Sequence, residues 1–163
     1  MKVSARNSTA GFAIRRAELS SPQAQALIGS LNVELAAMYP EPGANHFRLD
    51  AEDVAPSNGA FLIGYLSAEP VACGAIRRTE GDCAEIKRMY VAPTARGRGF
   101  SKLMLVALQD EARILGFTRL LLETGARQFA ALALYGNAGF KAIARFGEYA
   151  DSALSICMSK ELI

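Results

Sequence analysis

Apolar and polar positions along the N-terminal part of the chain predict a strand, a helix and then a long connection. Loose alternation over residues 11–19 is typical of a strand. A helix is predicted over 22–38, because apolar residues recur there at spacings of three and four and Ser21 offers a hydroxyl cap. Residues 40–58 contain three prolines, a glycine and many polar residues, so we expect a connection with one turn of helix over 48–53. Loops of this length inside a compact domain are often functional.

The rest of the chain alternates between apolar runs and one strongly amphipathic segment. Strand-like runs occupy 59–67, 70–78, 83–91, 117–123, 140–145 and 153–160. Helical spacing of apolar residues covers 99–115 and 128–138. The order of strand, helix and strand from 83 to 123 predicts a parallel pair joined by a right-handed crossover. We therefore predict an α+β domain built on a mixed sheet.

Length and composition favour one globular domain over residues 1–163, in which we expect residues 1–10 to be flexible. Half of the residues are apolar (51%) and 21% are charged, which is a globular balance. The net charge of only +2 argues against a nucleic-acid-binding protein. No apolar run is long enough to span a membrane, and residues 1–10 have no signal-peptide core. We expect a cytoplasmic protein without a membrane partner.

The cysteines and the histidine give no sign of a metal site. Cys73, Cys83 and Cys157 lie in separate apolar runs without C-x-x-C spacing, so we expect buried thiols. His46 is the single histidine, which leaves no paired ligand spacing for zinc. We predict no metal, and we keep His46 as a candidate substrate-binding residue in the long connection.

A basic, glycine-rich turn between an apolar strand and a helix is the first motif that suggests chemistry. Gly97 and Gly99 allow the backbone N–H groups to point in one direction, and the helix that follows adds the positive end of its dipole. Arg96, Arg98 and Lys102 add positive charge, so this junction is suited to a phosphate. The spacing matches neither the phosphate loop of nucleotide hydrolases nor the dinucleotide fingerprint.

Two patterns with fixed spacing lie in the second half of the chain. Arg96 and Gly99 fit the pattern [RQ]-x-x-G-x-[GA], which departs at its last position, where Ser101 replaces the usual Gly or Ala. About forty residues after the glycine turn, the segment 131–140 (ALALYGNAGF) is similar to A-x-x-L-Y-x-x-x-G-F. Together the two patterns resemble the GNAT superfamily of acyl-CoA-dependent N-acetyltransferases, and the resemblance implies a GNAT fold of the layered α/β/α kind. Its central sheet is mixed and mostly antiparallel, with about seven strands and helices on both faces.

The resemblance also implies a cosubstrate and a mechanism. Acetyl-CoA would lie where two neighbouring strands separate, with its pyrophosphate on the glycine turn. Its contacts would come from the strand before the turn, from the turn itself and from one amide, namely Met89, Tyr90, Val91, Arg96, Gly97, Arg98, Gly99, Phe100, Ser101, Lys102 and Gln128. Tyr135 would protonate the departing thiolate, and the acetyl group would pass directly to an amine. No cysteine nucleophile is implied.

The amine must lose a proton before it can attack a thioester, so a nearby carboxylate is expected. Glu85 resembles the strand glutamate that acts as a base in one branch of the family, directly or through water. It is equally compatible with a surface pair to Lys87 on the same strand face. Glu123, on the strand over 117–123, is the second candidate for the base.

The acceptor is the part of the function that the residues define least. Positively charged residues of the second hairpin and of the long connection would suit an amine that carries a carboxylate, with a loop tyrosine closing over it. The candidate substrate-binding residues are His46, Arg48, Arg78, Arg88 and Tyr149. A protein N-terminus or lysine and an aminoglycoside-like polyamine stay open as acceptors. A GNAT-fold module that binds acyl-CoA without transfer is the alternative function, and the family resemblance allows a homodimer.

Overall fold

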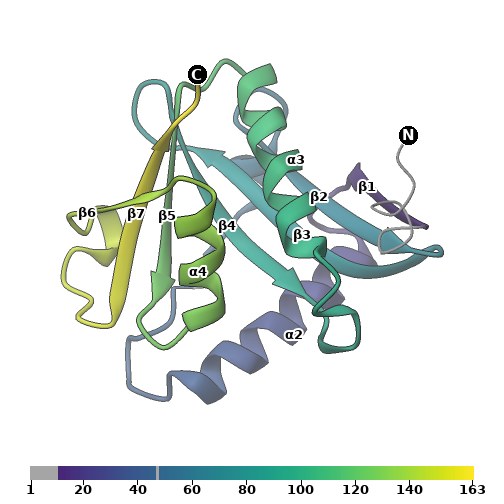
Figure 1. The fold of residues 1–163 in the computed structure, drawn as a ribbon, viewed down its shortest axis with the longest axis horizontal. Helices are drawn as coiled ribbons and strands as arrows, with labels where there is room; N and C mark the ends of the chain where they lie inside the picture. The colour runs from purple at the N-terminus through teal and green to yellow at the C-terminus, as the bar shows by residue number, and fades with distance from the viewer. Residues whose placement is uncertain (1–10, 47) are drawn as a thin grey trace.

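The computed structural model describes residues 11–46 and 48–163, which form a mixed sheet with helices on both faces (Figure 1). The prediction that residues 1–10 are flexible lies outside the described residues. The seven strands follow the order β1-β2-β3-β4-β5-β7-β6. Their bounds are β1 Phe12–Arg16, β2 Gly59–Leu66, β3 Glu69–Arg78, β4 Cys83–Val91, β5 Arg119–Gly125, β6 Lys141–Ile143 and β7 Ser155–Glu161. Only β4 and β5 pair in parallel, so the predicted fold class is confirmed.

Alternation along the central strands explains why both faces of the sheet carry helices. On β2, Leu62 packs in the cluster beneath α3 (Phe100–Ile114) and α4 (Phe129–Asn137), whereas its neighbours belong to the cluster beneath α2 (Pro22–Met38). Leu108 of α3 and Leu31 of α2 are buried on these opposite faces. Each such leucine contributes roughly 1.5–3 kcal/mol by leaving water. The two helical layers thus fix the sheet between them.

The helices begin and end close to where the sequence predicts. Ser21 caps α2 through its hydroxyl, which accepts from the N–H of Ala24 at 3.2 Å. The turn of helix expected in the long connection is a 3₁₀ helix, η1, over Ala51–Val54. Two further 3₁₀ turns, η2 and η3, occupy Pro93–Ala95 and Gly147–Tyr149. Among the described residues, no helix has both the length and the apolar character needed to cross a bilayer.

The predicted bounds of the edge strands are wrong by a few residues. The first strand covers Phe12–Arg16 rather than 11–19, and β6 covers only Lys141–Ile143 rather than 140–145. Each is an edge strand with a single neighbour, so fewer ladder hydrogen bonds extend it. Its length therefore depends on the partner strand rather than on its own pattern of apolar residues.

A fork in the sheet is the feature that creates space for a ligand. The pairing of β4 with β5 runs from Cys83 opposite Arg119 to Ile86 opposite Leu122 and ends there. Just beyond, the register between β3 and β4 shifts at a bulge where Arg88 has a left-handed φ of 58°. Figure 1 shows β4 and β5 diverging from this point toward α2.

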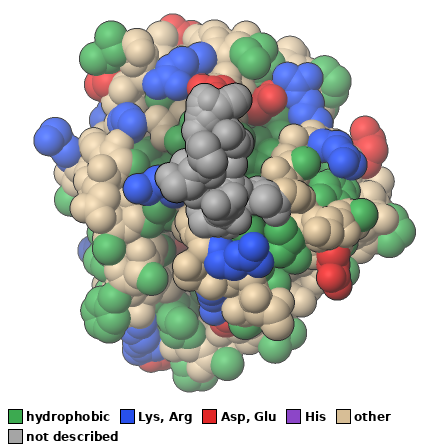
Figure 2. Space-filling model, turned by 45° about the vertical axis from the view of Figure 1, so that its right-hand side comes forward, with side chains coloured by type: hydrophobic (Ala, Val, Ile, Leu, Met, Phe, Trp, Pro, Cys, Tyr) green, Lys and Arg blue, Asp and Glu red, His purple; other side chains and the backbone are tan. Residues whose placement is uncertain are grey.

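The face shown in Figure 2 has a mixed surface. Lys and Arg side chains lie there in separate places, with apolar and acidic side chains between them. A protein that follows a nucleic-acid backbone usually presents a continuous basic patch or stripe instead. The described residues on this face form no such patch.

Candidate active site

A cavity of about 570 Å³ lies in the fork between β4 and β5. Its walls come from α2, β4, the turn before α3, the end of β5, α4 and η3. The volume falls in the range of pockets that take a cofactor or a small molecule. The family resemblance implied a binding site where these two strands separate, and this cavity lies there.

The glycine turn forms one end of the cavity. Gly97 and Gly99 have left-handed φ values of 80° and 83°, which glycine adopts without strain. Gly99 is the N-cap of α3, and residues 96–99 are exposed. The first N–H groups of a helix have no acceptor within the helix, and the helix dipole favours an anion beside them. This end of the cavity can therefore hold a phosphate group.

The residues predicted to bind the cosubstrate divide into those on the cavity wall and those beside it. Most of them line the cavity, namely Met89, Tyr90, Val91, Arg96, Gly97, Gly99, Phe100, Ser101 and Gln128. Arg98 is exposed and lies over the ring of Phe100, with 5.0 Å between its Cζ and the ring centroid. Lys102 lines a separate smaller pocket between α3 and α4.

Arg96 joins the glycine turn to α2. One of its terminal nitrogens lies 3.0 and 2.9 Å from the two carboxylate oxygens of Glu34, and its Nε donates to the carbonyl of Val91 at 2.8 Å. Glu34 is a cavity-lining residue that sequence reasoning missed. No local pattern reveals this pair, because 62 residues separate its members.

Gln128 stabilises the turn that leads into α4. Its side-chain oxygen accepts from the N–H of Gly125 at 2.9 Å and from the hydroxyl of Thr124 at 3.3 Å. Gln128 is also the N-cap residue of α4. The amide thus fixes the β5–α4 connection, which forms part of the cavity wall.

Tyr135 lies on α4 and reaches the cavity from inside the core. It is only 5% exposed and packs edge-on against Phe140, with 5.7 Å between ring centroids. Burial raises the pKa of its phenol, and the charge of Glu123 raises it further. The hydroxyl therefore stays protonated at neutral pH, so it can act as a proton donor.

Glu123 is the first residue of β5 beyond the last pair with β4, and it lines the same cavity. It is half-buried, and the hydroxyl of Ser155 donates to it at 2.6 Å. Burial raises the pKa of its carboxyl, an effect that the Ser155 hydrogen bond and the proximity of His46 partly offset. A carboxylate with a raised pKa in a cavity has the properties of a general base.

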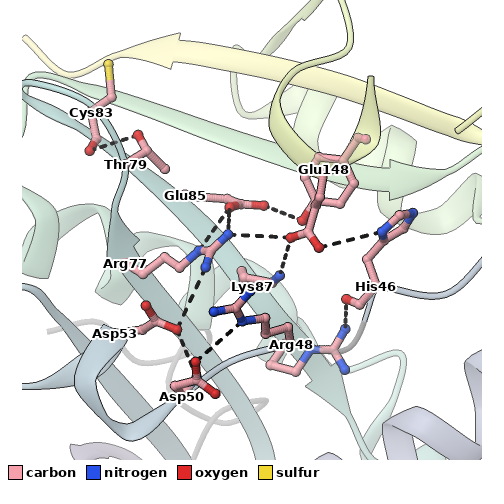
Figure 3. A network of polar contacts seen from close by, with 12 residues as sticks. His46, Arg48, Asp50, Asp53, Arg77, Thr79, Cys83, Glu85, Lys87 and Glu148 are labelled. Carbon is pink, nitrogen blue, oxygen red and sulfur yellow. Dashed lines mark hydrogen bonds and ion pairs between the residues drawn. The ribbon is translucent and has the colours of Figure 1, made fainter. Parts of the chain in front are cut away.

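Glu85 occupies a different environment from the one expected of a base. Its side chain is 1% exposed, and it is not among the described residues on the cavity wall. Arg77 donates to its Oε1 from Nε at 3.1 Å and from Nη2 at 3.0 Å, while the hydroxyl of Tyr149 donates to its Oε2 at 2.5 Å. Lys87, its predicted surface partner, instead donates to Glu148 at 3.3 Å. Figure 3 shows this network.

The five candidate substrate-binding residues are not all in one place. His46, Arg88 and Tyr149 line the cavity. Arg48 is exposed and pairs with Asp50 at 3.4 Å. Arg78 donates to the carbonyls of Gly81 and Ser57, so both Arg48 and Arg78 lie off the described cavity wall.

Glu148 is a second residue near the site that sequence reasoning missed. Its carboxylate lies 3.3 Å from Lys87, 3.5 Å from Arg77 and 3.7 Å from the Nδ1 of His46. Burial alone would raise the pKa of Glu148, but the proximity of Lys87, His46 and Arg77 lowers it overall. The only hint in the sequence is its place in the loop before the last strand, next to Tyr149.

The cysteines and the acidic residues add no further candidate site. Cys73 and Cys157 are buried and Cys83 is half-buried, all three as free thiols. Burial raises the pKa of the Cys73 thiol to about 12, which leaves it unreactive at neutral pH. Within the described part of the chain, no group of three or more His, Cys, Asp or Glu residues is arranged to hold a metal ion.

Comparison with known proteins gives concordant results. The sequence model of the Acetyltransferase (GNAT) family matches residues 25–140. A protein of Azospirillum brasilense named IAA acetyltransferase is 42% identical over 137 residues, which cover 83% of this chain and 88% of that protein. A solved structure from Klebsiella pneumoniae subsp. pneumoniae MGH 78578, described as an acyl-CoA N-acyltransferase, gives a TM-score of 0.81. Its identity is 31%, with 93% of this chain and 98% of the other covered.

A further solved structure shares the fold at lower identity. It is a GNAT family acetyltransferase from Elizabethkingia anophelis with acetyl-CoA bound, and its TM-score is 0.68 at 18% identity. The match covers 94% of this chain and 99% of the other. The same arrangement of strands and helices thus occurs in a protein that holds acetyl-CoA.

Proposed function

The chain belongs to the GNAT family and is an acetyl-CoA-dependent N-acetyltransferase, and from this premise we propose how its residues transfer the acetyl group to an amine. The observation that carries the proposal is the cavity in the fork. It combines a glycine turn suited to phosphate with the buried phenol of Tyr135 and the half-buried carboxylate of Glu123. Phosphate binding, a proton donor and a proton acceptor are what this reaction requires.

The glycine turn and the free side of β4 bind the cosubstrate in this proposal. Backbone N–H groups of Gly97 to Ser101 hold the pyrophosphate at the start of α3. Main-chain groups of Met89 and Val91 pair with the amides of the pantetheine arm much as a neighbouring strand would. This contact is available because β5 stops pairing with β4 at Ile86, which leaves that side of β4 on the cavity wall.

Tyr135 is the proposed general acid. The amine nitrogen attacks the thioester carbonyl carbon, the carbon–sulfur bond breaks, and the Tyr135 hydroxyl gives its proton to the departing sulfur. Burial keeps this phenol protonated before the reaction, as the raised pKa indicates. The phenol is restored by a proton from solvent, and no covalent enzyme intermediate is required.

Glu123 is the proposed general base, in place of Glu85. A base must come within hydrogen-bond reach of the amine, directly or through one water molecule. Glu123 lines the cavity, whereas Glu85 lies behind its wall with both oxygens engaged. Glu123 therefore takes the proton that the amine loses, and it passes this proton to solvent after product release.

The acceptor is proposed to be a small primary amine. Lys87 and Arg88 line the cavity near His46, and they offer positive charge to a carboxylate on the acceptor. The acceptor panel should therefore include amines with and without a carboxylate. It should also include the compound IAA named for the Azospirillum brasilense relative.

Thiol release from acetyl-CoA in the presence of this panel tests the proposed function. We expect at least one primary amine to raise thiol release well above hydrolysis without an amine, and mass spectrometry should find the acetylated product. If acetyl-CoA binds but no amine raises thiol release, the protein is an acyl-CoA-binding module and the proposed mechanism fails.

A further inference from the structure

The two carboxylates near the fork differ in what surrounds them. Glu123 accepts a hydrogen bond from the hydroxyl of Ser155 and lines the cavity. Glu85 accepts from two nitrogens of Arg77 and from Tyr149, and its side chain is 1% exposed. Arg77 lies directly opposite Glu85 on β3, so the ion pair is part of the sheet itself. This buried carboxylate is bound on both oxygens by neighbouring side chains.

Tyr149 connects Glu85 to the cavity wall through a hydrogen bond. The tyrosine belongs to η3, in the connection between β6 and β7, and it is 2% exposed. Its hydroxyl donates to Glu85, and the residue also lines the cavity. Its ring meets that of His46 edge-on, with 4.9 Å between the centroids. One hydrogen bond therefore joins the interior of the sheet to a wall of the cavity.

Glu148 reinforces this connection from the adjacent position. It lies within 4 Å of Lys87 on β4, Arg77 on β3 and His46 in the long connection, as Figure 3 shows. The loop before β7 and the connection after α2 are thus held against the same two strands. In the view of Figure 1 the connection between β6 and β7 and the start of α3 lie on opposite sides of α4.

We propose that Glu85 is a positioning residue that holds Tyr149, and with it His46, as the wall that selects the acceptor amine. The proposal rests on the proposed transfer to an amine. When only a fraction of the molecules has this wall in place, the apparent affinity for the acceptor is reduced to that fraction of its full value. Binding of the cosubstrate at the other end of the cavity should not change.

The alternative is that the buried pair only stabilises the fold. A purely structural role would change thermal stability and leave the KM for the acceptor unchanged in the folded enzyme. A base role would instead lower kcat and remove the acidic limb of the pH–rate profile. Measurement of KM and kcat for each substrate separates all three roles.

Two variants test the proposal. Tyr149→Phe keeps the ring and removes only the hydroxyl. Glu85→Gln keeps the shape of the carboxylate but has a single acceptor oxygen, which the two nitrogens of Arg77 retain, so that an NH₂ group replaces the acceptor that faces Tyr149. For both we expect the KM for the acceptor to rise about tenfold, as befits loss of a hydrogen bond to a charged group, with the KM for acetyl-CoA unchanged. The double variant should match the single variants, because both remove the same contact. Tyr65→Phe, half-buried on β2 and off the described cavity wall, is the control and should behave as wild type.

Three outcomes would overturn the proposal. A drop in kcat of a hundredfold or more in Glu85→Gln alone would restore Glu85 as the base. An unchanged acceptor KM in both folded variants would leave only a structural role, and additive effects in the double variant would show that the two residues act separately.

Hydrogen exchange tests the same contact without turnover. Amides of residues 146–152 should exchange faster in both variants than in wild type. If no amine is acetylated even by wild type, the proposed function fails, whereas unchanged exchange in this loop refutes the positioning role by itself.

Discussion

Replacement of Glu123 by glutamine separates the chemistry from the stability of the fold. Glutamine has the same shape, and its carbonyl oxygen can still accept the hydrogen bond that Ser155 gives to the carboxylate at 2.6 Å. What it cannot do is take a proton from an amine. The substitution therefore removes one function and leaves the packing of β5 in place.

The expected loss of activity follows from the exposure of this site. General base catalysis contributes typically 10²- to 10⁴-fold, or about 2.7–5.5 kcal/mol in activation free energy. Glu123 is only half-buried, so water can replace it as a weaker proton acceptor. We therefore expect kcat for Glu123→Gln to fall by about 10²- to 10³-fold, in the lower part of that range.

Stability should respond in the opposite direction. Burial raises the pKa of Glu123, so the folded protein binds its proton more tightly than the unfolded chain does. Its contribution to stability is fully present below the unfolded pKa and is lost as pH rises through the higher folded pKa. At pH 7 the wild type therefore carries the cost of a buried charge, which neutral glutamine removes. The Tm of Glu123→Gln should equal or exceed that of wild type at pH 7, and the advantage should shrink on acidification.

The assay is thiol release over a range of pH with a weakly basic acceptor, whose own ionisation lies below the pH range studied. Wild-type kcat should fall as pH drops through the raised pKa of Glu123, and the variant should lack this limb. Glu161→Gln, a carboxylate that is 67% exposed at the end of β7, is the control and should keep full activity. If Glu123→Gln keeps the wild-type kcat, the base role is refuted. If its Tm is several degrees lower and the loss of activity equals the loss of folded protein, the substitution acts on folding and the reasoning is refuted as well.

Further predictions concern other parts of the molecule. Tyr135→Phe should lower kcat about 10²-fold or more with little change in the KM for acetyl-CoA, which steady-state thiol release would detect; unchanged turnover would remove the phenol from the mechanism. Gly125→Ala should cost about 1–3 kcal/mol of unfolding free energy, because its methyl group would overlap the ring of Tyr39, the C-cap residue of α2. Gly29→Ala, in open space within α2, should instead gain about 0.5–1 kcal/mol, and urea unfolding compares the two. Thiol-specific labelling at pH 7 should modify Cys83 before Cys73 and leave activity unchanged, whereas inactivation in step with labelling would contradict direct transfer.

Much of the fold follows from local sequence signals. Pro22 with the Ser21 cap sets the start of α2, and the two left-handed glycines set the start of α3. The parallel pair follows from the strand–helix–strand order, which allows essentially one handedness. The glycine turn and Tyr135 could be predicted as site residues because each belongs to a pattern with fixed spacing, and both lie on one cavity.

The acceptor side of the site could not be predicted in the same way. Strict alternation along β4 would place Lys87 and Met89 on one face and Arg88 on the other. The bulge interrupts this alternation, because Arg88 adopts a left-handed φ, and all three residues line the cavity. Charge alone suggested Arg48 and Arg78 as substrate-binding residues. In the structure Arg48 pairs with the exposed Asp50, and Arg78 donates to two main-chain carbonyls, so neither lies on the described cavity wall.

The end of the β4–β5 pairing explains why two glutamates on adjacent parallel strands have different surroundings. Glu85 lies inside the paired segment, opposite Leu121, where neighbouring strands exclude water and a buried carboxylate must be matched by donors such as Arg77. Glu123 lies one residue beyond the last pair, where the strands part and a cavity replaces the neighbouring strand. The carboxylate is partly exposed there, and partial burial raises its pKa without supplying a full set of donors. A carboxylate suited to proton transfer therefore arises at the fork, and one suited to holding a loop arises behind it.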